Sequence, residues 1–370
     1  MTISMQDTKG TLHMKRGTRA ALVAAVVGAM LAFAGGAFAA NTGSVAVWHT
    51  PMVLGGSNST TIHITLPQAT DPIAAINIYV PAGYTLNTSQ AVGTNIGSVD
   101  AAAFSYDTNL TLPLSGSVTT DAPASHTADS TACARTATSA AVWILNLSVA
   151  GQTIALPLYV NPTVGAEQGL GAYKLSICLP PPDVPIGTPG RSANGAQVLD
   201  ASFTVNGVFK TPTAAGILRW ESLFTPYNRG KGTVNLAATF ETRSLVSLPV
   251  SLTASATYKK KTATYTLKGK LTEGGIPVPG IGAIILRGTV SSRLLKVAAA
   301  TTKADGSVTS VGNVKPKKTT YFKVTASSKQ RDFTTQGCVN PLPATVAPAG
   351  CVSATLSPLT ATSVVVKLKS

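Results

Sequence analysis

Hydrophobic and polar residues alternate in short runs along most of the chain. Ile62, Ile64 and Leu66, for example, alternate with polar residues, and a period of two indicates a β-strand with one buried face. After residue 40, no run shows the i, i+3, i+4, i+7 spacing of a long amphipathic helix. The pattern predicts an all-β fold, with β-sandwich domains in tandem. Further alternating runs lie at residues 76–80, 104–114, 142–149, 153–160, 173–179, 199–205, 218–223 and 236–240.

Turn-forming residues separate these runs. Five prolines within residues 179–195 block helices and central strands, which predicts an extended crossover between sheets. Asn206-Gly207 is a hairpin signal, because both residues tolerate positive φ. Residues 119–139 are small and polar, which predicts a long loop held at Cys133.

The C-terminal third has a distinctive arrangement of strands and turns. Tyr265 and Leu267 alternate with threonines and a lysine, Gly274-Gly275 interrupts the chain, and Asp305-Gly306 is a hairpin turn signal. The segments G-K-L-T-E-G-G-I-P-V-P-G (269–280) and T-K-A-D-G-S-V (302–308) resemble those of prealbumin-like, carboxypeptidase-regulatory-like and bacterial Ig-like surface modules. The resemblance implies a β-sandwich and specifies no ligand.

A chain of 370 residues is too long for one ordinary domain. We expect a signal peptide at residues 1–39, a β-sandwich region at 40–244, and a basic Ig-like module at 245–370. The middle region is either one elaborated domain or two small ones. One domain is favoured, because a Cys133–Cys178 bridge and the proline-rich crossover would tie its halves together.

The N-terminus has the features of an export signal. Lys15, Arg16 and Arg19 precede an apolar run at residues 20–34, and Ala37-Phe38-Ala39 is a small-x-small cleavage site. The run is short for a transmembrane helix, although an uncleaved anchor is the alternative. Its alanine-rich composition is typical of bacterial signals. We therefore expect a bacterial protein that is secreted, extracellular or at the cell surface.

The four cysteines follow the predicted signal, and an even number in an exported chain indicates disulfide bonds. Of the three possible pairings, Cys133–Cys178 and Cys338–Cys351 are favoured, because each pair stays within one expected domain. The chain has no C-x-x-C sequence, which argues against a zinc site.

Positive charge is concentrated in the C-terminal third. The formal net charge is +15, yet residues 40–244 carry eight basic and ten acidic residues, while residues 245–370 carry seventeen basic and three acidic. This asymmetry predicts docking on anionic envelope polymers or lipid headgroups. The alternative is that lysines on strand edges prevent aggregation. Sequence-specific nucleic-acid binding is not expected, since no aromatic platform accompanies the lysines. The candidate binding residues are Lys259, Lys260, Lys261, Lys268, Lys270, Lys315, Lys317 and Lys318.

Catalytic chemistry has little support in the sequence. There is no G-x-S-x-G, H-E-x-x-H or EF-hand motif, and the acidic residues are scattered. We expect no cofactor and no enzymatic activity; a hydrolase with an unrecognised site is a minor alternative. The main prediction is an exported, non-catalytic envelope protein. The principal alternative is a periplasmic or extracellular binder of a small ligand or copper, with His49, Met52 and His63 as copper candidates, because copper accepts imidazole and thioether ligands.

Overall fold

The computed structural model of this chain describes residues 41–149, 152–315, 318–329, 331–333 and 353–369. The expected signal peptide and the Cys338–Cys351 pair lie outside the described residues. Within them the fold is all-β, as predicted, and α2 (Thr127–Ala134) is a short helix between strands.

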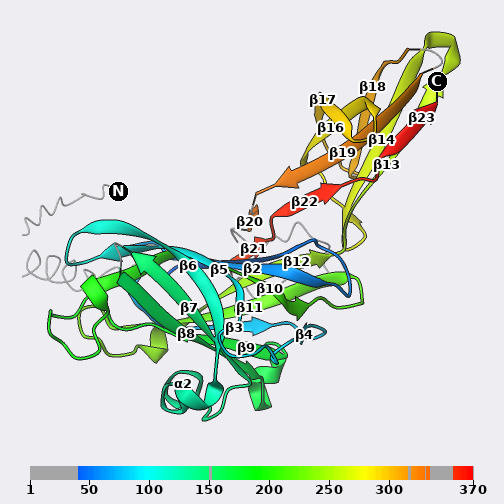
Figure 1. The fold of residues 1–370 in the computed structure, drawn as a ribbon. Helices are drawn as coiled ribbons and strands as arrows, with labels where there is room; N and C mark the ends of the chain where they lie inside the picture. Colours follow the sequence, from blue (N-terminus) through cyan, green and yellow to red (C-terminus); the bar gives the residue numbers. More distant parts are fainter. Residues whose placement is uncertain (1–40, 150–151, 316–317, 330, 334–352, 370) are drawn as a thin grey trace, which may run out of the picture. The chain divides into compact units, whose positions relative to one another are not determined.

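Fourteen strands form the larger sheet (Figure 1). Its hydrogen-bonded order is β1-β2-β10-β5-β6-β7-β8-β9-β3-β11-β12-β21-β20, with β4 beside β10. Neighbours are antiparallel, except that β12 and β21 are parallel. The strands are β1 (Ser44–Thr50), β2 (Ser57–Thr65), β3 (Ile73–Val80), β4 (Thr85–Leu86), β5 (Asn95–Ser105), β6 (Leu110–Asp121), β7 (Ala141–Val149), β8 (Gln152–Pro162), β9 (Tyr173–Cys178), β10 (Ala196–Lys210), β11 (Gly216–Pro226), β12 (Phe240–Leu248), β20 (Arg331–Phe333) and β21 (Ser353–Leu356).

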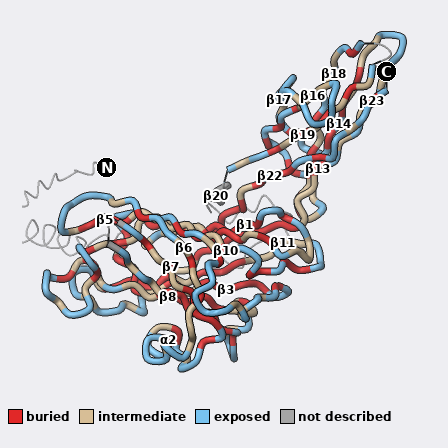
Figure 2. The backbone as a smooth tube through the Cα atoms, in the orientation of Figure 1, coloured by how far each residue is buried: buried red, intermediate tan, exposed pale blue. Residues whose placement is uncertain are grey.

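One hydrophobic core is shared by strands β1 to β12, and Figure 2 shows its buried positions along those strands. A row of aromatic rings crosses this core. Trp143 on β7 lies 6.0 Å from Phe209 on β10, and Phe209 lies 5.6 Å from Trp220 on β11, measured between ring centroids. All three side chains are fully buried. The rings thus join strands that are distant in the sheet order, which shows that the sheet folds over onto itself as a sandwich.

Serine and threonine hydroxyls join the outer edge of β1 to the far end of the same sheet. The Val47 N–H donates to Ser244 Oγ on β12 at 2.8 Å, and Ser357 Oγ donates to the Val47 carbonyl at 2.6 Å. Thr355 Oγ1 on β21 donates to the Val45 carbonyl. These side-chain bonds give the Val47 N–H and the carbonyl groups of Val45 and Val47 the partners that a neighbouring strand would otherwise supply.

Two smaller sheets form a second sandwich, as the resemblance implied. The first contains β13 (Val250–Lys259), β14 (Thr264–Glu273), β15 (Ile276–Pro277) and β18 (Ser307–Asn313), and the second contains β16 (Gly282–Val290), β17 (Arg293–Thr301), β19 (Thr319–Ser328), β22 (Leu359–Thr362) and β23 (Val366–Lys369). The predicted alternation is confirmed, because Tyr265 and Leu267 from one sheet and Phe322 and Val324 from the other are buried in a shared core. Membership of the Ig-like or prealbumin-like families stays a prediction.

The chain passes between the two sandwiches three times. β12 continues the larger sheet to Leu248, beyond the expected boundary at 244/245, and the second sandwich begins at Val250. After β19 the chain returns to form β20 and β21 in the larger sheet, and then re-enters the second sandwich at β22. The C-terminal third therefore contributes strands to the larger sheet as well as to the second sandwich, and Ala354 and Leu356 of β21 pack with Leu245 in a small separate cluster.

One turn prediction is confirmed, and the predicted crossover is confirmed in part. Gly274 and Gly275 have φ of 57° and 85°, and Glu273 pairs with Ile276 across them as a two-residue hairpin. Residues 179–195 do form a crossover, from β9 to β10 past four intervening strands, but the two strands belong to one sheet and not to two sheets as predicted.

Three local predictions are wrong. Asn206-Gly207 does not end a strand: Gly207 takes φ of 67° and the register shifts there, so β10 continues through a bulge. Asp305-Gly306 forms a turn, but β17 and β18 on either side belong to different sheets and make no hairpin. The expected loop at residues 119–139 contains the end of β6 and α2.

The Cys133–Cys178 disulfide is confirmed, and it ties α2 to the end of β9. Breaking it in a Cys133→Ala/Cys178→Ala variant should lower the free energy of unfolding by about 3–4 kcal/mol, because the bond closes a 45-residue separation and restricts the unfolded chain. Urea unfolding of the oxidised wild type and the variant measures this difference. Equal free energies would show that the bond contributes no net stability.

Ser244 provides a test of the closure at β1. Ser244→Ala should destabilise the fold by about 1–3 kcal/mol, because it leaves the buried Val47 N–H without an acceptor. Ser222→Ala is the matched control: Ser222 is equally buried, on β11, and its hydroxyl has no partner among the described residues. Its replacement should be neutral or stabilising. Similar losses in both variants would contradict a special role for the Ser244–Val47 bond.

Candidate functional site

The hairpin between β13 and β14 carries three of the predicted binding residues. Lys259 ends β13, and Lys260 and Lys261 form the one-turn 3-10 helix η5 (Lys260–Thr262). Ala263 then takes a left-handed conformation with φ of 49° and reverses the chain. All three lysines are exposed, so the tip of this hairpin presents three ammonium groups to solvent.

The segment after β18 lies beside this hairpin. Asn313 pairs with Thr264 in the sheet, and the Val314 N–H donates to the Ala263 carbonyl at 3.1 Å. Lys315, the next residue, is exposed, as is Lys318. The fold thereby brings lysines about fifty residues apart in sequence to the same end of the sandwich.

The second sheet adds further cations at this end. Arg287 on β16 donates from Nη1 to the Asn313 carbonyl at 3.0 Å, and its guanidinium carbon lies 5.8 Å from the Tyr265 ring centroid, within cation–π range. Lys369 lies opposite Thr319, next to Lys318. Arg293 follows the turn after β16 and is exposed. We name this group the cationic end: Lys259, Lys260, Lys261, Arg287, Arg293, Lys315, Lys318 and Lys369.

The acidic residues of the second sandwich lie at its opposite end. Within its described strands and turns they are Glu273, which is buried, and Asp305, in the turn before β18. The register fixes the separation: β18 starts beside Lys270 at the acidic end and finishes beside Thr264 at the cationic end. An open hollow of about 650 Å³ at the cationic end is lined by Arg287, Lys315 and Lys318.

Only some of the eight predicted lysines lie at the cationic end. Lys268 and Lys270 are exposed on the face of β14, farther from the hairpin tip, and Lys317 lies outside the described residues. Arg287 and Arg293 were missed by the sequence prediction. Their place depends on the register between β16, β17 and β19, which the spacing of arginines along the chain does not reveal.

No protein-family model matches this chain, and no curated protein matches it. Among solved structures, the full-length major pilin SpaD from Corynebacterium diphtheriae is similar over 77% of this chain and 56% of the pilin chain. The two share 10% sequence identity, with a TM-score of 0.26. This chain therefore spans little more than half the length of that pilin, and we draw nothing about function from a likeness at this TM-score.

The copper candidates do not converge. His49 points into the larger core, where Nε2 lies 2.7 Å from Tyr84 Oη and Nδ1 lies 3.0 Å from Thr60 Oγ1. His63 lies on the outer face of β2 and pairs with Asp200 at 2.8 Å, while Met52 is buried in the core. Within the described residues, no group of three or more His, Cys, Asp or Glu is placed to hold a metal. In the same part of the chain, no helix has the length and apolar character needed to cross a bilayer.

The buried imidazole of His49 makes stability depend on pH. Burial lowers its pKa from 6.5 to about 4, so between these values the unfolded chain binds more protons than the folded one, and stability falls as pH falls. The loss reaches about 3 kcal/mol near pH 4. His49→Gln removes this dependence, so the difference in unfolding free energy between wild type and variant should change by that amount from pH 7 to pH 4. Urea unfolding measures both free energies. If the difference between wild type and variant does not change with pH, the pH dependence does not come from His49.

Proposed function

We propose that this chain is an exported, non-catalytic protein of the bacterial envelope that binds anionic envelope polymers through its cationic end. The observation that carries the proposal is the separation of charge within the second sandwich, with eight basic side chains at one end and the acidic ones at the other. The N-terminal export signal in the sequence supports a location outside the cytoplasm.

A repeating polyanion fits this end better than a single small anion does. The cations come from the ends of both sheets, and several of them surround the open hollow. A flexible chain of phosphate or carboxylate groups can place one group in the hollow and contact Lys259, Lys260 and Lys261 with its neighbours. Multiple exposed charges raise the local concentration of such a polymer and speed its association. The hollow also favours a polymer over a flat membrane surface.

The supporting interactions are electrostatic and exposed, so salt should weaken them. The Debye length falls from about 10 Å at 0.1 M salt to about 3 Å at 1 M. Each lysine close to a strongly anionic surface contributes about 1 kcal/mol. Affinity should therefore fall in steps with the number of lysines removed from the cationic end, and fall smoothly with salt.

The test compares two variants with the same change in net charge. Lys259→Gln/Lys260→Gln/Lys261→Gln should reduce binding of the full mature chain to isolated bacterial envelopes roughly a hundredfold at 0.1 M salt, because three contributions of about 1 kcal/mol are lost. The control, Lys268→Gln/Lys270→Gln/Lys303→Gln, removes three lysines away from the cationic end and should have a much smaller effect. Co-sedimentation measures both.

Three outcomes would contradict the proposal. Equal losses in the two variants would mean that net charge, not the cationic end, governs binding. Absence of binding at low salt would leave the lysines as residues that prevent aggregation. Binding that transfers fully to vesicles of anionic phospholipid, and is not competed by purified wall polymer, would identify the membrane surface as the partner. The full chain is needed, because a fragment starting at residue 245 would separate part of β12 from its sheet.

A further inference from the structure

The first sandwich contains a small apolar cavity of about 110 Å³. Its walls come from β5 to β8, from the start of β3, and from the proline-rich crossover that leads into β10. Leu114, Leu147 and Leu156 supply branched side chains to the wall, and no charged side chain lines it. The cavity belongs to the first sandwich, whereas the cationic end belongs to the second.

Alanines leave this space open. Ala101 and Ala103 point inward from β5, and Ala193 and Ala196 line the cavity from the crossover and the start of β10. At other inward positions of the same core the residues are larger, such as Val99 on β5. Protein interiors are usually packed without such spaces, because an empty cavity lowers stability. Ala103 is buried and Ala101 and Ala196 are partly buried, whereas Ala193 is exposed. A space that small residues keep open at these three positions indicates room for a ligand.

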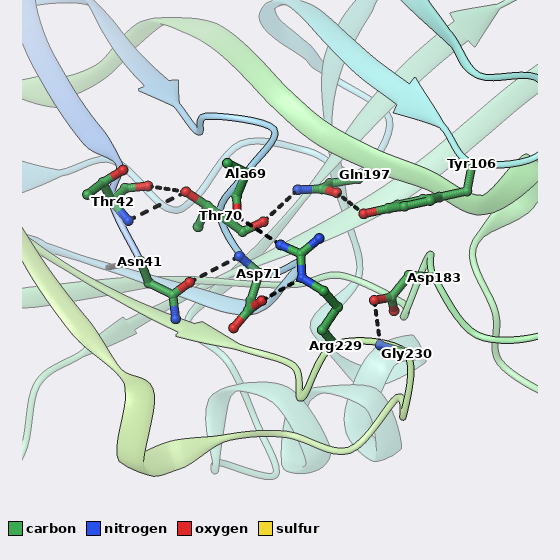
Figure 3. Close-up of polar contacts among 10 residues, drawn as sticks. All are labelled: Asn41, Thr42, Ala69, Thr70, Asp71, Tyr106, Asp183, Gln197, Arg229 and Gly230. Atoms are coloured by element: carbon green, nitrogen blue, oxygen red, sulfur yellow. Dashed lines mark hydrogen bonds and ion pairs between the residues drawn. The ribbon is translucent and has the colours of Figure 1, made fainter. Parts of the chain in front are cut away.

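One polar group in the wall has no partner. Ser192 is only 7% exposed, and among the described residues its hydroxyl has no hydrogen-bond partner. The other polar side chain of the wall, Gln197, is already satisfied: Nε2 donates to the Thr70 carbonyl at 3.1 Å, and Oε1 accepts from Tyr106 Oη at 2.7 Å (Figure 3). A buried hydroxyl without a partner is costly, so Ser192 offers a single hydrogen bond to an occupant.

Ion pairs and backbone bonds fix the loops beside the cavity. Arg229 Nε donates to Asp71 Oδ1 at 2.9 Å, and Arg229 Nη2 donates to the Ala69 carbonyl at 2.8 Å (Figure 3). The Gly230 N–H donates to Asp183 Oδ2 at 2.6 Å. Asp71 and Asp183 are adjacent in sequence to Pro72 and Pro182, which line the cavity. The wall is therefore held in place before a ligand arrives, as in most small-molecule sites.

We infer that this cavity binds a small neutral molecule, or the end of a larger one, with an apolar ring or short chain and one hydroxyl or carbonyl group. The apolar wall excludes a charged occupant, since burying an unpaired charge is strongly unfavourable. An apolar cavity of about 150 Å³ accommodates benzene in another protein, so a single six-membered ring is near the upper size. The polar group of the ligand pairs with Ser192 Oγ. This inference is independent of the proposed function.

The experiment titrates the full mature chain with phenol, toluene and benzoate, and follows the methyl signals of Leu147 and Leu156 by NMR. Phenol should bind saturably, toluene more weakly, and benzoate, a charged molecule of similar size, not at all. Ser192→Ala should weaken phenol binding about tenfold and leave toluene binding unchanged. Absence of saturable phenol binding to the wild type would overturn the inference, as would loss of both ligands equally in Ser192→Ala.

Filling the cavity provides a second, independent variant. Ala103→Leu should abolish binding of phenol and toluene, whereas Ala102→Leu, which alters the next residue on β5 outside the cavity wall, should bind as the wild type does. If Ala103→Leu fails to fold, Ala196→Val fills the same cavity from β10. The comparison of phenol and toluene binding in Ser192→Ala also tests the site independently. Wild-type affinity in a folded Ala103→Leu protein would refute the site. Binding to envelopes should be unchanged in every one of these variants, so failure of this inference is distinguishable from failure of the proposed function.

Discussion

Every backbone N–H and C=O group removed from water needs a partner, and this requirement governs how the larger sheet is finished. β1 is bonded to β2 on one side only; on its other side the partners are hydroxyls of Ser244, Thr355 and Ser357. A second regular ladder at this edge would fix β1 against one strand. Hydroxyl contacts instead join β1 both to β12 and to the segment at β21. The sheet therefore closes around its aromatic core without a regular strand register between β1 and β12.

The use of β21 in this closure explains why the chain is interwoven. A segment near the C-terminus completes the first sandwich, although the chain has already formed most of the second. Strands β13 to β19 of the second sandwich are consequently flanked in the chain by β12 and β20 of the larger sheet, and β22 and β23 follow β21. Charge and cavity are divided between the two sandwiches: the nearly neutral first sandwich holds the apolar cavity, and the second holds the cationic end.

The local sequence pattern was enough to predict the strands. The composition of the two candidate sites depends on pairing between distant strands, which the pattern does not reveal. The alternation around Tyr265 and Leu267 reflects a period of two that any half-buried strand must show, so β14 and its exposed lysines were predictable. The Cys133–Cys178 bond followed from counting cysteines within one expected domain. Arg287 and Ser192 were not predictable as site residues, because their surroundings are assembled from strands far apart in sequence. Gly207 shows the same limit, since a positive φ serves a bulge as well as a hairpin, and only the neighbouring strand distinguishes the two.

The three passages of chain between the sandwiches have a mechanical consequence. Two domains joined by one linker carry an external pull in series, and the linker alone bears it. Here a pull applied between the sandwiches is shared by three covalent segments, and one of them is anchored by β21, which is hydrogen-bonded on both sides within the larger sheet. Pulling the two sandwiches apart therefore loads the hydrogen bonds of β21 with both of its neighbours as well as the covalent connections.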